Sequence, residues 1–192
     1  MAREKELERI HRELNGDGTR RIVVLHDLGG VGKTQLSIAY AKRHKDNYSA
    51  IFWLNIKDKN LLKQSFARIG GQILREHPSS RLSTVDMKGN LEDLINAIKE
   101  WLSLSNNTRW LMIFDNYDNP KLLNNTDPSA VDIHKCLPES YQGSIIITSR
   151  LSQIGMGHTI PIKKLVDIQD SLDILSNTSG RERLKNGKKG LQ

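Results

Sequence analysis

The chain has 192 residues, of which 37% are hydrophobic, so its length and composition predict about one folded domain and exclude a disordered chain. Its net charge of +7 would suit a polyanion, but the basic residues are spread along the chain, with a local excess only at 181–190, and we do not expect nucleic acid as a partner. The single cysteine excludes an internal disulfide, and the absence of a long apolar run or a signal-peptide core predicts a cytoplasmic protein without a membrane partner.

The pattern of apolar residues predicts a succession of helices and strands. In chain order they are a helix at 3–14, a strand at 20–26, a helix at 33–44, a strand at 48–56, helices at 60–74 and 91–102, strands at 109–115, 144–149 and 158–162, and a last helix at 166–176. Residues 75–90 are expected to form a loop, and Asn90 is expected to cap the helix that follows. This order predicts an α/β fold, in which a mainly parallel sheet of five strands has helices on both faces.

Two strands carry more specific information. In RWLMIFD, five successive apolar residues precede Asp115, which is typical of a strand buried on both faces. Pro161 predicts that the strand at 158–162 lies at an edge of the sheet, because proline has no N–H to donate to a neighbouring strand. In folds of this class ligands bind beyond the carboxyl ends of the strands. The glycine-rich stretch that follows residue 26 lies at such an end.

The stretch GGVGKT stands between a predicted strand and a predicted helix, which is the context of a Walker A phosphate loop. Its glycines allow backbone N–H groups to face a phosphate, its lysine can reach the β- and γ-phosphates, and its threonine can ligate Mg²⁺. The predicted nucleotide-binding residues are Gly29, Gly30, Val31, Gly32, Lys33, Thr34 and Gln35. The alternative, a glycine-rich turn without a ligand, is disfavoured by six matching residues in that context.

Asp27 departs from the phosphate-loop pattern, G-x-x-x-x-G-K-[ST], which has glycine at its first position. Aspartate tolerates left-handed backbone better than most residues, so we expect the turn to form. A carboxylate facing the phosphates would weaken binding by charge repulsion, whereas one turned aside would cap a nearby N–H. We expect weakened binding, and not its loss.

Three further residues complete the predicted site. Asp115 ends a buried strand and is expected to anchor Mg²⁺ together with Thr34. The next residue is Asn116, where many ATP-hydrolysing proteins have a second acid; an amide cannot act as a base, so we expect slow hydrolysis or none. Arg150 ends the strand at 144–149 and is expected to sense a γ-phosphate. Asp115 and Arg150 are therefore the candidate catalytic residues.

The ordered motifs LHDLGGVGKTQLSIAYA, AIFWLNI, WLMIFDN, GSIIITSR and KLVDIQDSLDIL resemble the NB-ARC domain, the nucleotide switch of the STAND class of P-loop NTPases, and most closely its fungal NOD-like receptor members. The resemblance implies a three-layer P-loop NTPase fold, a switch between ADP-bound and ATP-bound states with Mg²⁺, and self-association or NOD-like receptor partners. It also implies that residues 3 and 4 are the end of an element that helps to hold adenine.

The resemblance divides the chain into three parts: a helix and linker at 1–20, the nucleotide-binding core at 21–165, and the truncated start of a helical subdomain with a basic tail at 166–192. The family's GLPL and MHD motifs do not follow. We therefore expect a signalling switch module reduced to its nucleotide-binding core. The alternatives are an active P-loop ATPase or kinase, which Asn116 disfavours, and a truncated remnant that binds nothing, which Asp27 favours.

Overall fold

The computed structural model describes residues 3–16, 18–122 and 125–164. Its elements, in chain order, are α1 (Glu4–Leu14), β1 (Arg21–His26), α2 (Lys33–Arg43), the 3-10 helix η1 (Lys45–Asn47), β2 (Ala50–Asn55), α3 (Lys59–Glu76), η2 (Arg81–Thr84), α4 (Leu91–Leu102), β3 (Trp110–Asp115), η3 (Ile133–Cys136), β4 (Ser144–Ser149) and β5 (His158–Pro161). No helix in these ranges is long and apolar enough to cross a membrane.

The five strands form one sheet in the order β2-β3-β4-β1-β5, and each neighbouring pair runs parallel. The strand with Pro161 lies at an edge, as the sequence predicts. β1, β4 and β3 are the three central strands, so their carboxyl ends lie side by side. The consecutive strands β1 and β2 are separated by two others, and the connection between them carries the phosphate-loop sequence.

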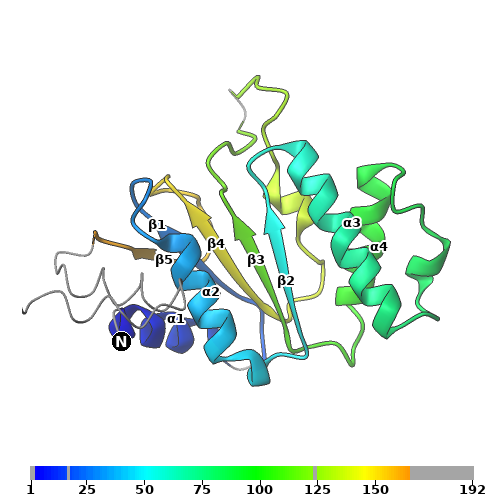
Figure 1. The fold of residues 1–192 in the computed structure, drawn as a ribbon, viewed down its shortest axis with the longest axis horizontal. Helices are drawn as coiled ribbons and strands as arrows, with labels where there is room; N and C mark the ends of the chain where they lie inside the picture. Colours follow the sequence, from blue (N-terminus) through cyan, green and yellow to red (C-terminus); the bar gives the residue numbers. More distant parts are fainter. Residues whose placement is uncertain (1–2, 17, 123–124, 165–192) are drawn as a thin grey trace, which may run out of the picture.

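The apolar side chains form two cores, one on each face of the sheet. α1 and α2 cover one face of the sheet, where they pack against side chains of β1 such as Val23 and Leu25. α3 and α4 cover the other face, packing on β3 residues such as Met112 and Phe114. Figure 1 shows α2 in front of the sheet and α3 and α4 beside β2. The predicted three-layer α/β architecture with a parallel five-stranded sheet is confirmed.

Local capping explains where the two helices of the second face begin. The Asp58 carboxylate accepts hydrogen bonds from the N–H groups of Asn60 and Leu61, both at 2.9 Å, which satisfies two N–H groups at the start of α3. Asn90 caps α4 by accepting from the N–H of Glu92 at 2.9 Å, as predicted from the sequence.

The predicted elements agree with the structure within a few residues, with one correction. The segment 75–90 was expected to be loop, but it contains the last residues of α3 and the short 3-10 helix η2. Leu82 of η2 is 1% exposed and packs in the core beneath α3 and α4, and this burial fixes the turn. The helix predicted at 166–176 lies outside the described residues.

Candidate functional site

The candidate site lies where the carboxyl ends of the three central strands meet. The phosphate loop follows β1, Asp115 ends β3, and Arg150 follows β4. Because these strands are neighbours in the sheet, the parallel topology alone brings the three segments together. Open α/β sheets bind their ligands beyond the carboxyl ends of their strands.

The phosphate loop has a backbone that few residues other than glycine adopt. Gly30 and Gly32 have φ angles of 81° and 91°, and Asp27 has a φ of 150°, a value at which a side chain is strained. The Asp27 carboxylate accepts a hydrogen bond from the N–H of Leu28 at 2.6 Å. Thus the turn forms despite the missing glycine, and the carboxylate caps an N–H of the loop itself.

Lys33 opens α2 and turns its side chain back under the loop. Its ammonium donates hydrogen bonds to the carbonyl oxygens of Asp27 at 2.7 Å and Leu28 at 2.9 Å, and the residue is only 9% exposed. Burial lowers the pKa of this ammonium from its ordinary value, while the carboxylates of Asp118 and Asp27 oppose that change. A buried cation directly below a loop of glycines can attract a phosphate group.

Thr34 and Asp115 meet although they are 81 positions apart in the chain. The Thr34 hydroxyl donates to the Asp115 carboxylate across 2.9 Å, and Asp115 is 5% exposed. Ligand oxygens about 2.1 Å from an octahedral Mg²⁺ lie about 3 Å from one another. A hydroxyl and a carboxylate at this separation therefore fit two adjacent positions around one Mg²⁺.

No three His, Cys, Asp or Glu side chains gather as a metal cluster within 3–16, 18–122 and 125–164. Mg²⁺ takes one or two protein ligands and completes its shell with water and substrate phosphates. The pair Thr34 and Asp115 thus suits Mg²⁺ held beside a nucleotide, and does not suit a metal caged by protein alone.

Thr148 is a member of the site that the sequence analysis missed. Its hydroxyl donates to the Asp115 carboxylate at 2.6 Å and accepts the N–H of Asn116 at 3.0 Å. The same carboxylate oxygen therefore faces two hydroxyls, which orient it. A threonine near the carboxyl end of the apolar run SIIITS was the available sequence signal for this role.

Asn116 directly follows Asp115 at the end of β3. Its backbone is left-handed, with a φ of 66°, and its amide donates to the Asp115 carboxylate at 3.3 Å and to the Asn55 side-chain oxygen at 3.5 Å. The amide is a donor to Asp115, so in this arrangement it cannot withdraw a proton from water.

Arg150 lies against the phosphate loop, but it is held by an acid. Its Nε is 3.0 Å from the Asp118 carboxylate, and its backbone N–H donates to the same carboxylate at 2.7 Å. A Cβ built on Gly29 would lie 3.6 Å from this Nε, which shows how close the guanidinium is to the loop. The exposed Arg150 and the partly buried Asp118 thus form an ion pair at the rim of the site.

The remaining predicted residues have different surroundings. Val31 is buried in the core under α1 and α2, so only its backbone can serve a ligand, whereas Gln35 is exposed on the first turn of α2. The Val31 carbonyl accepts from the guanidinium of Arg3 at 2.6 Å. The sequence analysis did not foresee this contact.

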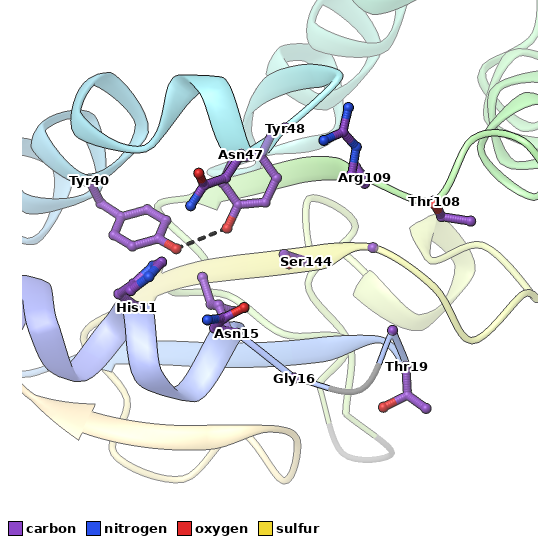
Figure 2. Close-up of a pocket in the computed structure, with 13 residues that line it drawn as sticks. His11, Asn15, Gly16, Thr19, Tyr40, Asn47, Tyr48, Thr108, Arg109 and Ser144 are labelled. Carbon is purple, nitrogen blue, oxygen red and sulfur yellow. Dashed lines mark hydrogen bonds between the residues drawn. The ribbon is translucent and has the colours of Figure 1, made fainter.

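A hollow of about 250 Å³ lies away from this site, at the amino ends of the strands. Residues preceding or opening strands line it, among them Thr19, Arg109 and Ser144. Figure 2 shows the hydroxyls of Tyr40 and Tyr48 bonded to each other across its wall, at 2.9 Å. Because the phosphate loop follows the opposite ends of the strands, this hollow is separate from the candidate site.

Comparison with known proteins points to one family. A family model described as the NB-ARC domain matches residues 3–185. A nucleotide-binding leucine-rich repeat (NLR)-like protein of the organism Hyaloscypha variabilis is 24% identical over an alignment 193 residues long, gaps included, which covers 93% of this chain. The match covers 18% of that protein, so the chain spans less than a fifth of the length of this relative.

Solved structures share the fold at low sequence identity. The chain is similar to the Aeropyrum pernix ORC2 protein in ADPNP–ADP complexes, with a TM-score of 0.56 and 16% identity over 94% of this chain and 52% of that one. It is similar to Cdc6p from Pyrobaculum aerophilum, with a TM-score of 0.59 and 15% identity over 93% of this chain and 49% of that one. At these identities the likeness is one of fold.

Proposed function

Because the chain belongs to the NB-ARC domain family, we propose that it is a nucleotide-binding signalling switch module, which holds ADP or ATP together with Mg²⁺. One observation carries the proposal. A glycine loop, a buried lysine and a threonine–aspartate pair at 2.9 Å meet at one end of the sheet, although Asp115 is far from the others in sequence. A glycine-rich turn without a ligand would not require this convergence.

Each residue has a proposed role in holding the nucleotide. The N–H groups of Gly29, Gly30 and Gly32 surround the phosphates, and the Lys33 ammonium exchanges its carbonyl partners for phosphate oxygens. Thr34 and Asp115 hold Mg²⁺, which neutralises phosphate charge when bound. Arg150 exchanges Asp118 for a γ-phosphate, which would make its position depend on which nucleotide is present.

Slow hydrolysis is part of the proposal, and Asn116 supports it. We predict that Asn116→Asp raises the rate of ATP hydrolysis at least several-fold, because it supplies a carboxylate that can accept a proton from water. Phosphate release at saturating ATP and Mg²⁺ measures the rate. An unchanged rate in a folded Asn116→Asp protein would mean that a missing base does not limit hydrolysis.

The proposed function also includes a location in the cell and a class of partners. The relative from Hyaloscypha variabilis carries the name of an NLR-like protein, and on that basis we propose cytoplasmic signalling, with self-association or NLR-type proteins as partners. An active ATPase or kinase remains the second candidate, since Thr34, Asp115 and Arg150 could also serve transfer chemistry. Rapid turnover by the wild-type protein would favour it.

The nucleotide content of freshly purified protein tests the proposal. The protein is denatured, and the released nucleotide is identified by chromatography. We expect ADP or ATP near one equivalent in the wild-type protein and almost none in Lys33→Ala. A wild-type protein that is empty and does not bind added ADP or ATP with Mg²⁺ would contradict the proposal and favour a module that has lost binding.

A further inference from the structure

Arg3, at the start of α1, makes contacts that the proposed site does not explain. Its side chain is 5% exposed, and its guanidinium donates to the carbonyl oxygens of Val31 at 2.6 Å and Lys163 at 2.9 Å. It also pairs with Glu6 at 3.3 Å. One side chain thus joins three segments: the helix that enters the core, the phosphate loop, and the chain that leaves β5.

The contact with Val31 orients a peptide group of the phosphate loop. In a trans peptide the C=O and the following N–H point in opposite directions, and none of the described peptide bonds is cis. The Val31 carbonyl faces Arg3, so the N–H of Gly32 faces away from Arg3. Gly32 has a φ of 91° and immediately precedes Lys33, so this N–H belongs to the group that would surround a phosphate.

The placement of Arg3 costs free energy, which argues against a role in packing alone. Its backbone is left-handed, with a φ of 70°, and its Nε is buried with no hydrogen-bond partner in the described part of the chain. Strained backbone and an unsatisfied buried donor each destabilise a fold. Meanwhile α1 already packs on the core through Leu7, Ile10 and Leu14.

We propose that Arg3 is a positioning residue for the phosphate loop, which fixes the Val31–Gly32 peptide and couples nucleotide binding to α1 and to the segment after β5. The proposal rests on the proposed nucleotide-binding function. When α1 or the segment at Lys163 is displaced, Arg3 leaves the Val31 carbonyl and the loop loses its orientation. A bound phosphate, in turn, stabilises the arrangement in which both segments are docked.

The exit segment has a second connection to the same place. The N–H of Ile162 donates to the carbonyl of His26 at 2.9 Å, and His26 is the last residue of β1, directly before the loop. Lys163 therefore presents its carbonyl to Arg3 from a fixed position. Both contacts place the chain leaving β5 next to the start of the phosphate loop.

The first test uses hydrogen exchange in the nucleotide-free full chain, so it does not depend on nucleotide binding. We expect amides of residues 28–33 to exchange at least tenfold faster in Arg3→Ala than in the wild type, with Arg3→Lys in between. Arg12→Ala is the matched control, because Arg12 is on the same helix with its side chain 73% exposed, and it should behave as wild type. Leu7→Ala loosens the packing of α1 but retains the guanidinium, so we expect it to speed exchange of the loop less than Arg3→Ala does.

The second test compares ADP with pyrophosphate, which has no base. We expect Arg3→Ala to weaken both by about the same factor, roughly tenfold, which corresponds to the loss of one charged hydrogen bond. A folded Arg3→Ala protein with wild-type loop exchange would overturn the proposal. So would a loss of affinity confined to ADP, since the guanidinium would then read the base. A wild-type protein that binds no nucleotide would contradict the proposed function, while the exchange test would still decide the role of Arg3.

Discussion

Asp27 shows how one side chain can replace a glycine in a phosphate loop. Its φ of 150° is a conformation that glycine adopts readily, and its carboxylate compensates in part by accepting the Leu28 N–H at 2.6 Å. Its carbonyl is also a partner of the Lys33 ammonium. Asp27 therefore combines backbone strain, a hydrogen bond and a negative charge. Different substitutions at this position remove different members of this set.

We predict that Asp27→Gly tightens ADP binding, because the Asp27 carboxylate puts a negative charge close to Lys33 even while it caps the Leu28 N–H, and stabilises the fold by about 1 kcal/mol, because it relieves backbone strain. Asp27→Asn is the matched control: it removes the charge and retains a side-chain oxygen for Leu28. Calorimetric titration gives the affinity, and urea unfolding gives the stability. Equal gains in affinity from both variants would assign the effect to charge, whereas weaker binding by both would show that the carboxylate supports the loop.

Among the elements, the start of β4 depends on a close contact between Gly143, the residue before it, and β3. Gly143 has a φ of 81°, and a Cβ at this position would collide with the ring of Trp110, the buried first residue of β3. The Trp110 indole N–H donates to the Leu102 carbonyl at 3.0 Å, which ties the strand to the end of α4. The ring therefore has little freedom to move aside.

We predict that Gly143→Ala lowers the free energy of unfolding by about 2–4 kcal/mol, through this collision and the strained φ. Gly71→Ala is the contrasting substitution, because Gly71 lies within α3 and a Cβ there meets nothing within 4 Å. It should stabilise the protein by roughly 0.5–1 kcal/mol, since alanine favours helix. Urea unfolding of both variants checks the pair, and similar stabilities would contradict the prediction.

The contact between α1 and α2 should respond to pH. The rings of His11 and His44 stack with centroids 4.2 Å apart. Burial, with the nearby His11 and Arg43, lowers the pKa of His44 in the folded protein. Below its ordinary pKa of about 6.5, the unfolded chain takes up a proton at His44 that the folded chain resists, so stability is present above that pH and is lost as pH falls.

We predict that His44→Phe, which retains a ring but cannot titrate, loses less stability than the wild type between pH 7 and pH 5. Urea unfolding at several pH values measures the two curves. The difference between the curves reports the loss of the titrating ring of His44, including its interaction with the stacked His11. Parallel curves would show that His44 does not contribute to the pH dependence of stability in this range.

Local patterns were sufficient to predict the elements and the motif residues, because burial of apolar side chains determines periodicity and the phosphate loop requires its glycines. The contacts of Arg3 with Val31 and of Arg150 with Asp118 could not be predicted in this way. They join segments that are 28 and 32 residues apart in sequence, and they depend on side-chain direction in the folded chain. The backbone angle of Asp27 likewise depends on the loop as a whole.

In the molecule as a whole, the residues of the candidate site lie at the carboxyl ends of the parallel strands. The order β3-β4-β1 brings Asp115, Arg150 and the phosphate loop together. Arg3 connects α1 and the chain that leaves β5 to the same loop. A nucleotide bound there would contact three segments of the chain, and Arg3 would link the phosphate loop among them to α1 and to the chain after β5. This arrangement supports a module whose bound nucleotide affects its flanking segments.

Titration of ADP with Mg²⁺ into nucleotide-stripped protein measures whether the chain binds nucleotide through its phosphate loop. The comparison is between the wild type, Lys33→Ala, and Lys42→Ala, a matched control because Lys42 is exposed on the same helix. We predict saturable binding near one equivalent for the wild type and Lys42→Ala, and loss of at least 100-fold in affinity for Lys33→Ala. Absence of binding in the wild type, or equal affinity in all three proteins, would contradict the account.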